Sequence, residues 1–172
     1  MLQTFDRLLG WTSTALAWFA CALIPCMFTM ITVDVSIRTF GYRPPLFTSS
    51  VVEYALLYLA MFSAPWLVRE RGHVAIEALL SVTPDAIRRP LARVVYAVSA
   101  AVCFLFAYLC WGLFWQYWVG GELDIRGIDI PYWFQFFPLP LCFALAGLEF
   151  CMYLVGLRSY YSYDLGEVKD SV

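Results

Sequence analysis

Long apolar segments alternate with short polar segments along this chain. Four segments are almost entirely apolar: Trp11–Val33, Val51–Val68, Leu91–Val119 and Tyr132–Leu157. An α-helix rises 1.5 Å per residue, so about 18–20 residues cross a hydrocarbon core of ~30 Å, and each segment is long enough. In lipid the backbone N–H and C=O groups must pair within the segment, which favours helices over open strands. The pattern predicts an all-α integral membrane protein with four transmembrane helices.

The composition supports a membrane protein without a soluble domain. Hydrophobic residues make up 62% of the 172 residues and charged residues only 14%, whereas about 25% of residues are charged in an average soluble domain. The four spans leave no room for a separate soluble core. We therefore interpret residues 1–172 as one membrane domain, with an inner segment at about 69–90 and a C-terminal tail at 158–172.

The distribution of Lys and Arg predicts the orientation. Cytoplasmic connections are enriched in these residues. A cytoplasmic N-terminus puts eight of the 11 on the inner side, which makes both termini cytoplasmic in a multi-pass protein of a bacterial inner membrane. The first span is too long for the apolar part of a secretory signal, and no small-residue cleavage pattern follows it, so we expect it to be retained. The inner set is Arg7, Arg69, Arg71, Arg88, Arg89, Arg93, Arg158 and Lys169; the outer set is Arg38, Arg43 and Arg126.

Two further segments have the pattern of helices that lie at the membrane surface. Ahead of the first span, Leu2, Phe5, Leu8 and Leu9 share one helical face. Within the inner segment, apolar residues recur at helical spacing between flanking arginines, which would contact anionic headgroups. These residues are Ile76, Leu79, Leu80, Thr83 and Ile87.

Local signals indicate where helices begin and bend. Ser50 and Glu53 have the spacing of a capping box, which gives Glu53 a structural explanation beside an ion pair or a contact with another protein. Thr83 and Pro84 suit the start of a second short inner helix. Pro90 is expected to interrupt hydrogen bonding and bend the chain into the third span.

The chain shows no set of residues for catalysis or for binding a cofactor. It has one histidine, His73, and all six cysteines lie in apolar spans without a C-x-x-C motif. No glycine-rich phosphate loop is present. We therefore expect no enzyme activity, no cofactor, no metal and no nucleic-acid partner.

Glu149 is the one ionisable residue deep within a predicted span, about eight residues from the inner end of the fourth. A carboxylate at that depth needs a cation or strong donors, which Arg93 or a residue of another protein could provide. Two alternatives stay open: an accessory or anchoring subunit of another complex, and a small four-helix exporter. An exporter would need an essential acid in its first span, where only Asp34 lies near the edge.

Several motifs resemble the small membrane subunit of TRAP (tripartite ATP-independent periplasmic) transporters, the DctQ-type family. They are Val52-Glu53-Tyr54, the Arg71–Glu77 element around His73, and Ile130–Trp133 followed by Pro140–Phe143, with Cys142 where the family more often has glycine. The resemblance covers roughly residues 15–158. It implies a scaffold subunit of a secondary, ion-coupled transporter for organic acids. It also implies two protein partners: a large membrane subunit that carries the substrate and sodium sites, and a periplasmic solute-binding protein that docks transiently.

We predict two sets of interface residues. The first set would contact the large subunit or membrane lipid at the inner face and at the ends of the spans: Glu53, Arg69, Arg71, His73, Glu77 and Glu149. The second set lies in the acidic outer loop and would contact the solute-binding protein: Glu122, Asp124 and Asp129. The simpler alternative for the second set is a solvated hydrophilic turn.

Overall fold

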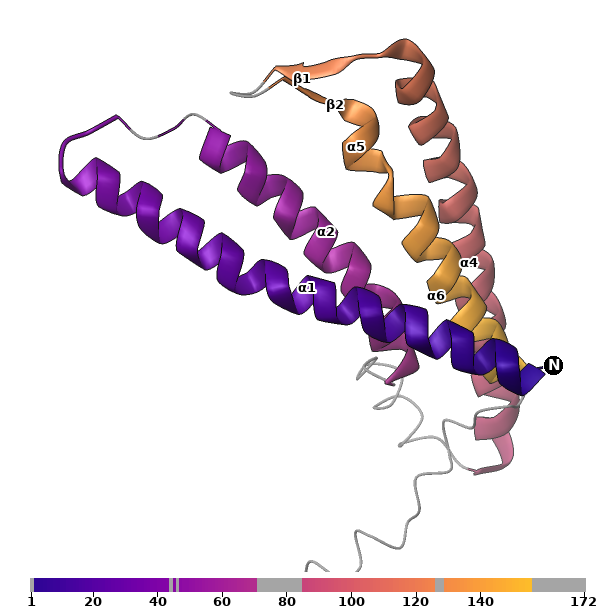
Figure 1. Ribbon diagram of the computed structural model, residues 1–172. Coiled ribbons are helices and arrows are strands. Elements are labelled where there is room, and N and C mark those ends of the chain that lie inside the picture. Colours follow the sequence, from indigo (N-terminus) through magenta and orange to yellow (C-terminus); the bar gives the residue numbers. More distant parts are fainter. Residues whose placement is uncertain (1, 44, 46, 71–84, 126–128, 156–172) are drawn as a thin grey trace, which may run out of the picture.

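The computed structural model describes the chain except residues 1, 44, 46, 71–84, 126–128 and 156–172. Its elements are α1 (Leu2–Thr39), α2 (Phe47–Arg69), α4 (Asp85–Gly120), β1 (Leu123–Ile125), β2 (Asp129–Pro131), α5 (Tyr132–Phe136) and α6 (Pro138–Leu154) (Figure 1). Four helical stretches are long and apolar enough to cross a membrane, so the predicted four spans are confirmed. They are Thr4–Thr39, Phe47–Arg69, Pro90–Gly120 and Tyr132–Leu154.

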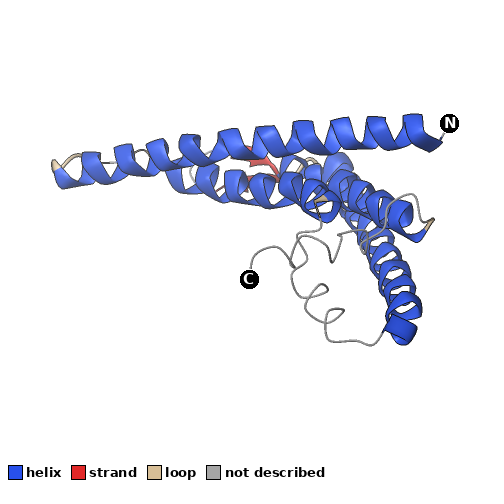
Figure 2. Cartoon of the chain, turned by 90° about the horizontal axis from the view of Figure 1, so that it is seen from below, coloured by secondary structure: helices blue, strands red, loops and turns tan. Residues whose placement is uncertain are grey.

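The helices form two pairs that are joined mainly by packing between α2 and α6. α1 packs along α2, α4 packs along α6, and α2 packs against α6. The two pairs converge at the end that carries the N-terminus and spread apart toward the hairpin end (Figure 1). Figure 2, viewed from below, shows α1 extending far past the other helices on one side. The helix that holds the pairs together is therefore α6 with its neighbour α2.

The buried fraction of each span reflects how closely other helices pack around it. Half of the apolar stretch of the fourth span is buried, against only 6% for the first span. A core cluster at the converging end includes Val68, Tyr96, Ala146, Phe150 and Tyr153. A smaller cluster joins Ala20, Phe62 and Cys142. Most of the surface of α1 is left for lipid or for another protein.

α4 and α6 approach each other closely at Gly147. A Cβ atom built there would lie 3.2 Å from the Phe104 ring and 3.3 Å from Cys103 Cβ. The close approach of α4 and α6 therefore lies at Gly147, about one and a half turns after Cys142. Cys142 itself is buried against α1 and α2 residues.

Two sequence predictions about helix boundaries were wrong, and a third is not tested. α1 is one continuous helix of 38 residues, about 57 Å long at 1.5 Å per residue, with no break between a surface helix and a span. α2 begins at Phe47, so Ser50 lies inside the first turns and is not the N-cap residue. Pro90 lies inside α4, which begins at Asp85, so the proline does not end the helix; the bend expected there stays a prediction.

The predicted inner surface helix around Ile76–Ile87 falls largely on residues 71–84, outside the described residues. The same holds for Thr83 and Pro84, proposed as its neighbouring helix start, and for the C-terminal tail. The structure contains no membrane, so the positions of both termini relative to the bilayer stay predictions.

The loop between the third and fourth spans contains two paired strands that the sequence did not predict. β1 and β2 pair antiparallel, with Asp124 opposite Ile130. Gly121 adopts φ +63°, a conformation that favours glycine, where the chain leaves α4. β2 leads directly into α5, so the described strands lie next to the start of the fourth span.

Candidate functional site

A polar network lies at the converging end of the helices, around Glu149 of α6. The Glu149 side chain has an exposed fraction of 0%. Its Oε1 accepts a hydrogen bond from Ser13 Oγ of α1 at 3.0 Å and from Arg69 Nη1 of α2 at 3.1 Å. Burying a carboxylate costs free energy unless it is paired and hydrogen-bonded. Three different spans therefore provide the acid, the cation and the hydroxyl of one buried network.

Arg69 also joins the beginning of α1. Its guanidinium donates to the Asp6 backbone carbonyl at 3.4 Å, and Nη2 lies 3.8 Å from Asp6 Oδ2. The cation therefore bridges two acids, one on α1 and one on α6. The sequence predicted that Glu149 needs a cation, and the structure supplies Arg69 rather than Arg93, which is exposed on α4.

The main chain at the C-terminal end of α2 is hydrogen-bonded to α6, the same helix that binds the Arg69 side chain. Tyr153 donates its hydroxyl to the carbonyls of Arg69 at 2.7 Å and Val68 at 3.3 Å. The last four carbonyls of a helix have no partner within the helix and must find one elsewhere. Glu149 and Tyr153 are four residues apart on α6, so one face of α6 binds both the side chain and the main chain of Arg69.

Gly10 leaves the space that the Arg69 guanidinium occupies. Gly10 is buried, and a Cβ atom built there would overlap the guanidinium group. Asp6, Gly10 and Ser13 are spaced at i, i+4 and i+7, which puts them on one face of α1. Sequence reasoning missed these three residues, although that helical spacing of small and polar residues was a usable signal.

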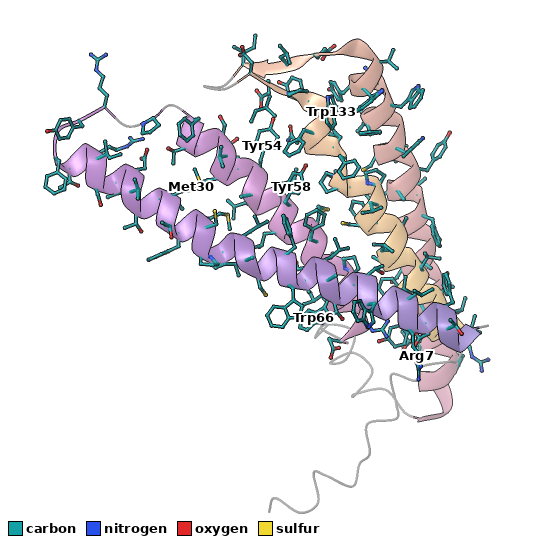
Figure 3. The ribbon with its side chains drawn as sticks, in the orientation of Figure 1. Arg7, Met30, Tyr54, Tyr58, Trp66 and Trp133 are labelled. Atoms are coloured by element: carbon teal, nitrogen blue, oxygen red, sulfur yellow. The ribbon has the colours of Figure 1, made fainter. Side chains whose placement is uncertain are left out.

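A second polar contact lies near the hairpin. Tyr54 of α2 donates a hydrogen bond to Asp124 Oδ2 of β1 at 3.0 Å. The Asp124 side chain has an exposed fraction of only 5%. Figure 3 shows Tyr54 and Tyr58 on the side of α2 that faces α5. This contact ties the hairpin to the second span.

A neighbouring hydrogen bond replaces a backbone partner that a proline removes. Pro138 has no N–H, so the Phe134 carbonyl loses the partner that it would have in a regular helix. Tyr58 donates its hydroxyl to that carbonyl at 2.6 Å. The fourth span is consequently divided into α5 and α6 at Phe137, whose N–H still bonds to the Trp133 carbonyl. The sequence showed Pro138 but gave no indication that Tyr58 would compensate for it.

The structure separates the predicted site residues into groups. It brings Arg69 and Glu149 together, leaves Glu122 and Asp129 exposed on the hairpin, and buries Asp124. Glu53 is exposed and lines a small cleft with Tyr54, Asp124 and Gln135. Arg71, His73 and Glu77 lie outside the described residues. Within the part of the chain that the structure covers, no group of three or more His, Cys, Asp or Glu side chains could hold a metal ion.

Tyr54→Phe is expected to lower the free energy of unfolding by about 1–3 kcal/mol, since it removes the hydroxyl that donates to the buried Asp124 carboxylate. The matched control is Tyr108→Phe, because the Tyr108 side chain is 75% exposed on α4. Denaturant titration in detergent micelles measures both variants. Equal stability of the two would mean that the Tyr54–Asp124 bond contributes nothing to the fold.

Comparison with known proteins places the chain in a family. A comparison with individual curated proteins gave no match. The family model described as "Tripartite ATP-independent periplasmic transporters, DctQ component" matches residues 27–158, which include α2, α4, the hairpin and α6. That family is a transporter component and not an enzyme family. The chain therefore belongs to the DctQ family, the small membrane subunit of TRAP transporters, as the motifs around Glu53, His73 and Trp133 indicated.

Proposed function

We propose that this chain is the small scaffold subunit of a secondary, ion-coupled TRAP transporter that takes up organic acids. In this proposal a large membrane subunit carries the substrate and sodium sites, and a periplasmic solute-binding protein delivers the substrate. The protein would lie in a bacterial inner membrane with both termini in the cytoplasm. The observation that carries the proposal is that Glu149 forms an ion pair with Arg69 within the subunit.

A transport site needs charged or polar groups that a solute or an ion can reach. Ionisable residues within spans usually mark such pathways. Glu149 is fully buried and bonded to Ser13 and Arg69, so it supports the joining of three helices and not the passage of a solute. A rigid subunit with a closed polar network suits a scaffold.

The exposed apolar faces support a subunit that works in an assembly. The first span is buried over only 6% of its apolar stretch and the third over 17%. Such faces have to contact lipid or another membrane protein. We propose that Glu53, Arg71, His73 and Glu77 contact the large subunit or lipid directly, whereas Arg69 and Glu149 contribute by fixing the angle between the helix pairs.

The isolated protein is expected to be inert. Reconstituted alone into liposomes with a sodium gradient, it should accumulate no organic acid, because it would lack the substrate and sodium sites. Co-reconstitution with the large subunit and the loaded solute-binding protein should give uptake, measured with a radiolabelled acid. Sodium-driven accumulation by the small subunit alone would contradict the proposal.

The exposed acids of the hairpin are expected to contribute to receptor docking. Replacing Glu122 and Asp129 by Gln and Asn should lower uptake by the full transporter several-fold at limiting solute-binding protein, since rim charges act mainly on association rates. Glu70→Gln is the matched control, because Glu70 is exposed at the opposite end of α2. Unchanged uptake would leave the hairpin as a solvated link between spans. Asp124 is excluded from the test because it is buried against Tyr54.

A further inference from the structure

Two adjoining grooves run along α1 near its N-terminal end. The first has a volume of about 970 Å³ and is lined in part by Arg7, Trp11 and Arg69. The second has a volume of about 320 Å³ and lies between α1 and α2. Thr14 and Trp18 line both grooves, so the two adjoin; together they are called the α1 channel below. Figure 3 shows Arg7 on α1 and Trp66 on α2 near the converging end of the helices.

The first groove is basic. Arg7 and Arg69 are its charged lining residues, whereas neither Asp6 nor Glu149 lines it. Arg7 is exposed, and it forms no ion pair with any residue in the described part of the chain. A guanidinium group matches the geometry of a phosphate and can bind it through two parallel N–H groups. This end of the α1 channel therefore has the chemistry of a phosphate site.

Two tryptophans border the basic groove. The Trp11 side chain is 81% exposed and the Trp18 side chain 73% exposed. Amphipathic indole rings favour the headgroup level of a bilayer. Trp11 lies about one helical turn after Arg7, which fits a groove end at the depth of lipid phosphates, whereas Trp18 lies about three turns after Arg7 and also borders the apolar groove.

The second groove is almost entirely apolar. It extends from Thr14 to Ile24 on α1, about 15 Å at 1.5 Å per residue, and its other wall includes Leu59, Trp66 and Leu67 of α2. An apolar track of this kind excludes a free phosphate or a soluble anion as the complete ligand. It fits an acyl chain that lies along the two helices.

We propose that the α1 channel binds one anionic phospholipid, with the phosphate at Arg7 and the exposed edge of Arg69, and an acyl chain between α1 and α2. A basic end joined to an apolar track complements such a lipid, which has an anionic headgroup and apolar acyl chains. A helix of a partner protein would fill the apolar part and would need an acidic side chain of its own at Arg7, whereas a phospholipid provides both parts in one molecule. The site is independent of the transport role, since it requires only that the subunit is embedded in a bilayer.

Native mass spectrometry of the detergent-purified protein tests the headgroup part, with dioleoylphosphatidylglycerol and dioleoylphosphatidylcholine as probes. The wild type should prefer the anionic lipid, and Arg7→Gln should weaken its binding by about fivefold. Arg93→Gln is the matched control, because Arg93 is an exposed arginine of α4 outside both grooves. Unchanged binding by Arg7→Gln, or an equal loss in Arg93→Gln, would overturn the assignment.

Two further measurements test the acyl-chain part. Ala17→Phe narrows the apolar groove and should lower binding of the same lipid, whereas Ala97→Phe on the exposed face of α4 should not. Glycerol 3-phosphate should fail to displace the lipid, and displacement would show that a headgroup alone suffices. A photoreactive residue at position 17 should label phospholipid in native membranes. Labelling of another polypeptide without lipid would show that a partner helix occupies the groove.

Discussion

Arg69→Ala is expected to lower the free energy of unfolding by about 3–5 kcal/mol, the largest effect of any single substitution considered. The substitution leaves the Glu149 carboxylate buried without its guanidinium partner, and the loss of one member of a buried ion pair is strongly destabilising. It also removes the link to Asp6 on α1. Denaturant titration in mixed micelles, followed by tryptophan fluorescence, measures the effect. Recovery of the complex with the large subunit should fall in parallel.

A double substitution distinguishes the cost of an unpaired charge from a general need for the pair. Arg69→Met combined with Glu149→Met should recover most of the lost stability, because apolar side chains of similar size need no partners. Arg93→Ala, at an exposed position of α4, should stay within about 0.5 kcal/mol of the wild type. If Arg69→Ala behaves like Arg93→Ala, the network does not hold the helices together.

The network and the shape of the subunit are linked. α1 contacts α6 only sparsely, and the Ser13–Glu149 bond joins them at the converging end. Arg69 joins α2 to both at the same place. The network fixes the two helix pairs at the converging end, and at the other end α2 is joined to the hairpin by the Tyr54–Asp124 bond and to α5 by the Tyr58–Phe134 bond. Loss of Arg69 would weaken the attachment of the pairs at the converging end, and the proposed scaffold role depends on the angle between them.

The spans could be predicted from hydrophobicity, but their ends could not. The first apolar segment stops at Val33, while α1 continues to Thr39. Thr32 and Ser36 donate their hydroxyls to carbonyls four residues earlier, and Arg38 pairs with Asp34 at 2.8 Å. These polar side chains are satisfied within the helix, so they do not end it. A count of apolar residues does not detect such continuation.

The candidate site was predictable only in part. The depth of Glu149 in an apolar span showed that it needs a cation, because the cost of a buried charge depends on local surroundings alone. The identity of that cation depends on how the helices cross, and Arg69 and Arg93 are equivalent in the sequence pattern. Asp124 was likewise grouped with Glu122 and Asp129, because the sequence pattern does not distinguish the three acidic residues of this loop. Only the hairpin register turns Asp124 inward to Tyr54.

Gly10→Ala is expected to lower the free energy of unfolding by about 1–3 kcal/mol, the second large effect, although alanine is the better helix former. The added methyl group overlaps the Arg69 guanidinium, which the contacts with Glu149 and Asp6 hold in place. Arg69 must move away, and the ion pair with Glu149 weakens. The same denaturant titration measures the change.

Testing Gly10→Ala both in the wild type and in an Arg69→Ala protein decides whether this explanation holds. In an Arg69→Ala protein the overlapping group is absent, so Gly10→Ala should become stabilising by up to about 1 kcal/mol, as expected for glycine to alanine in a helix. Gly112 of α4 has open space where its Cβ would lie, so Gly112→Ala should be stabilising in both backgrounds. If the effect on stability changes sign between the two backgrounds for Gly10→Ala but not for Gly112→Ala, Gly10 and Arg69 are coupled. If Gly10→Ala has the same effect in both backgrounds, the glycine is not there to make room for the cation.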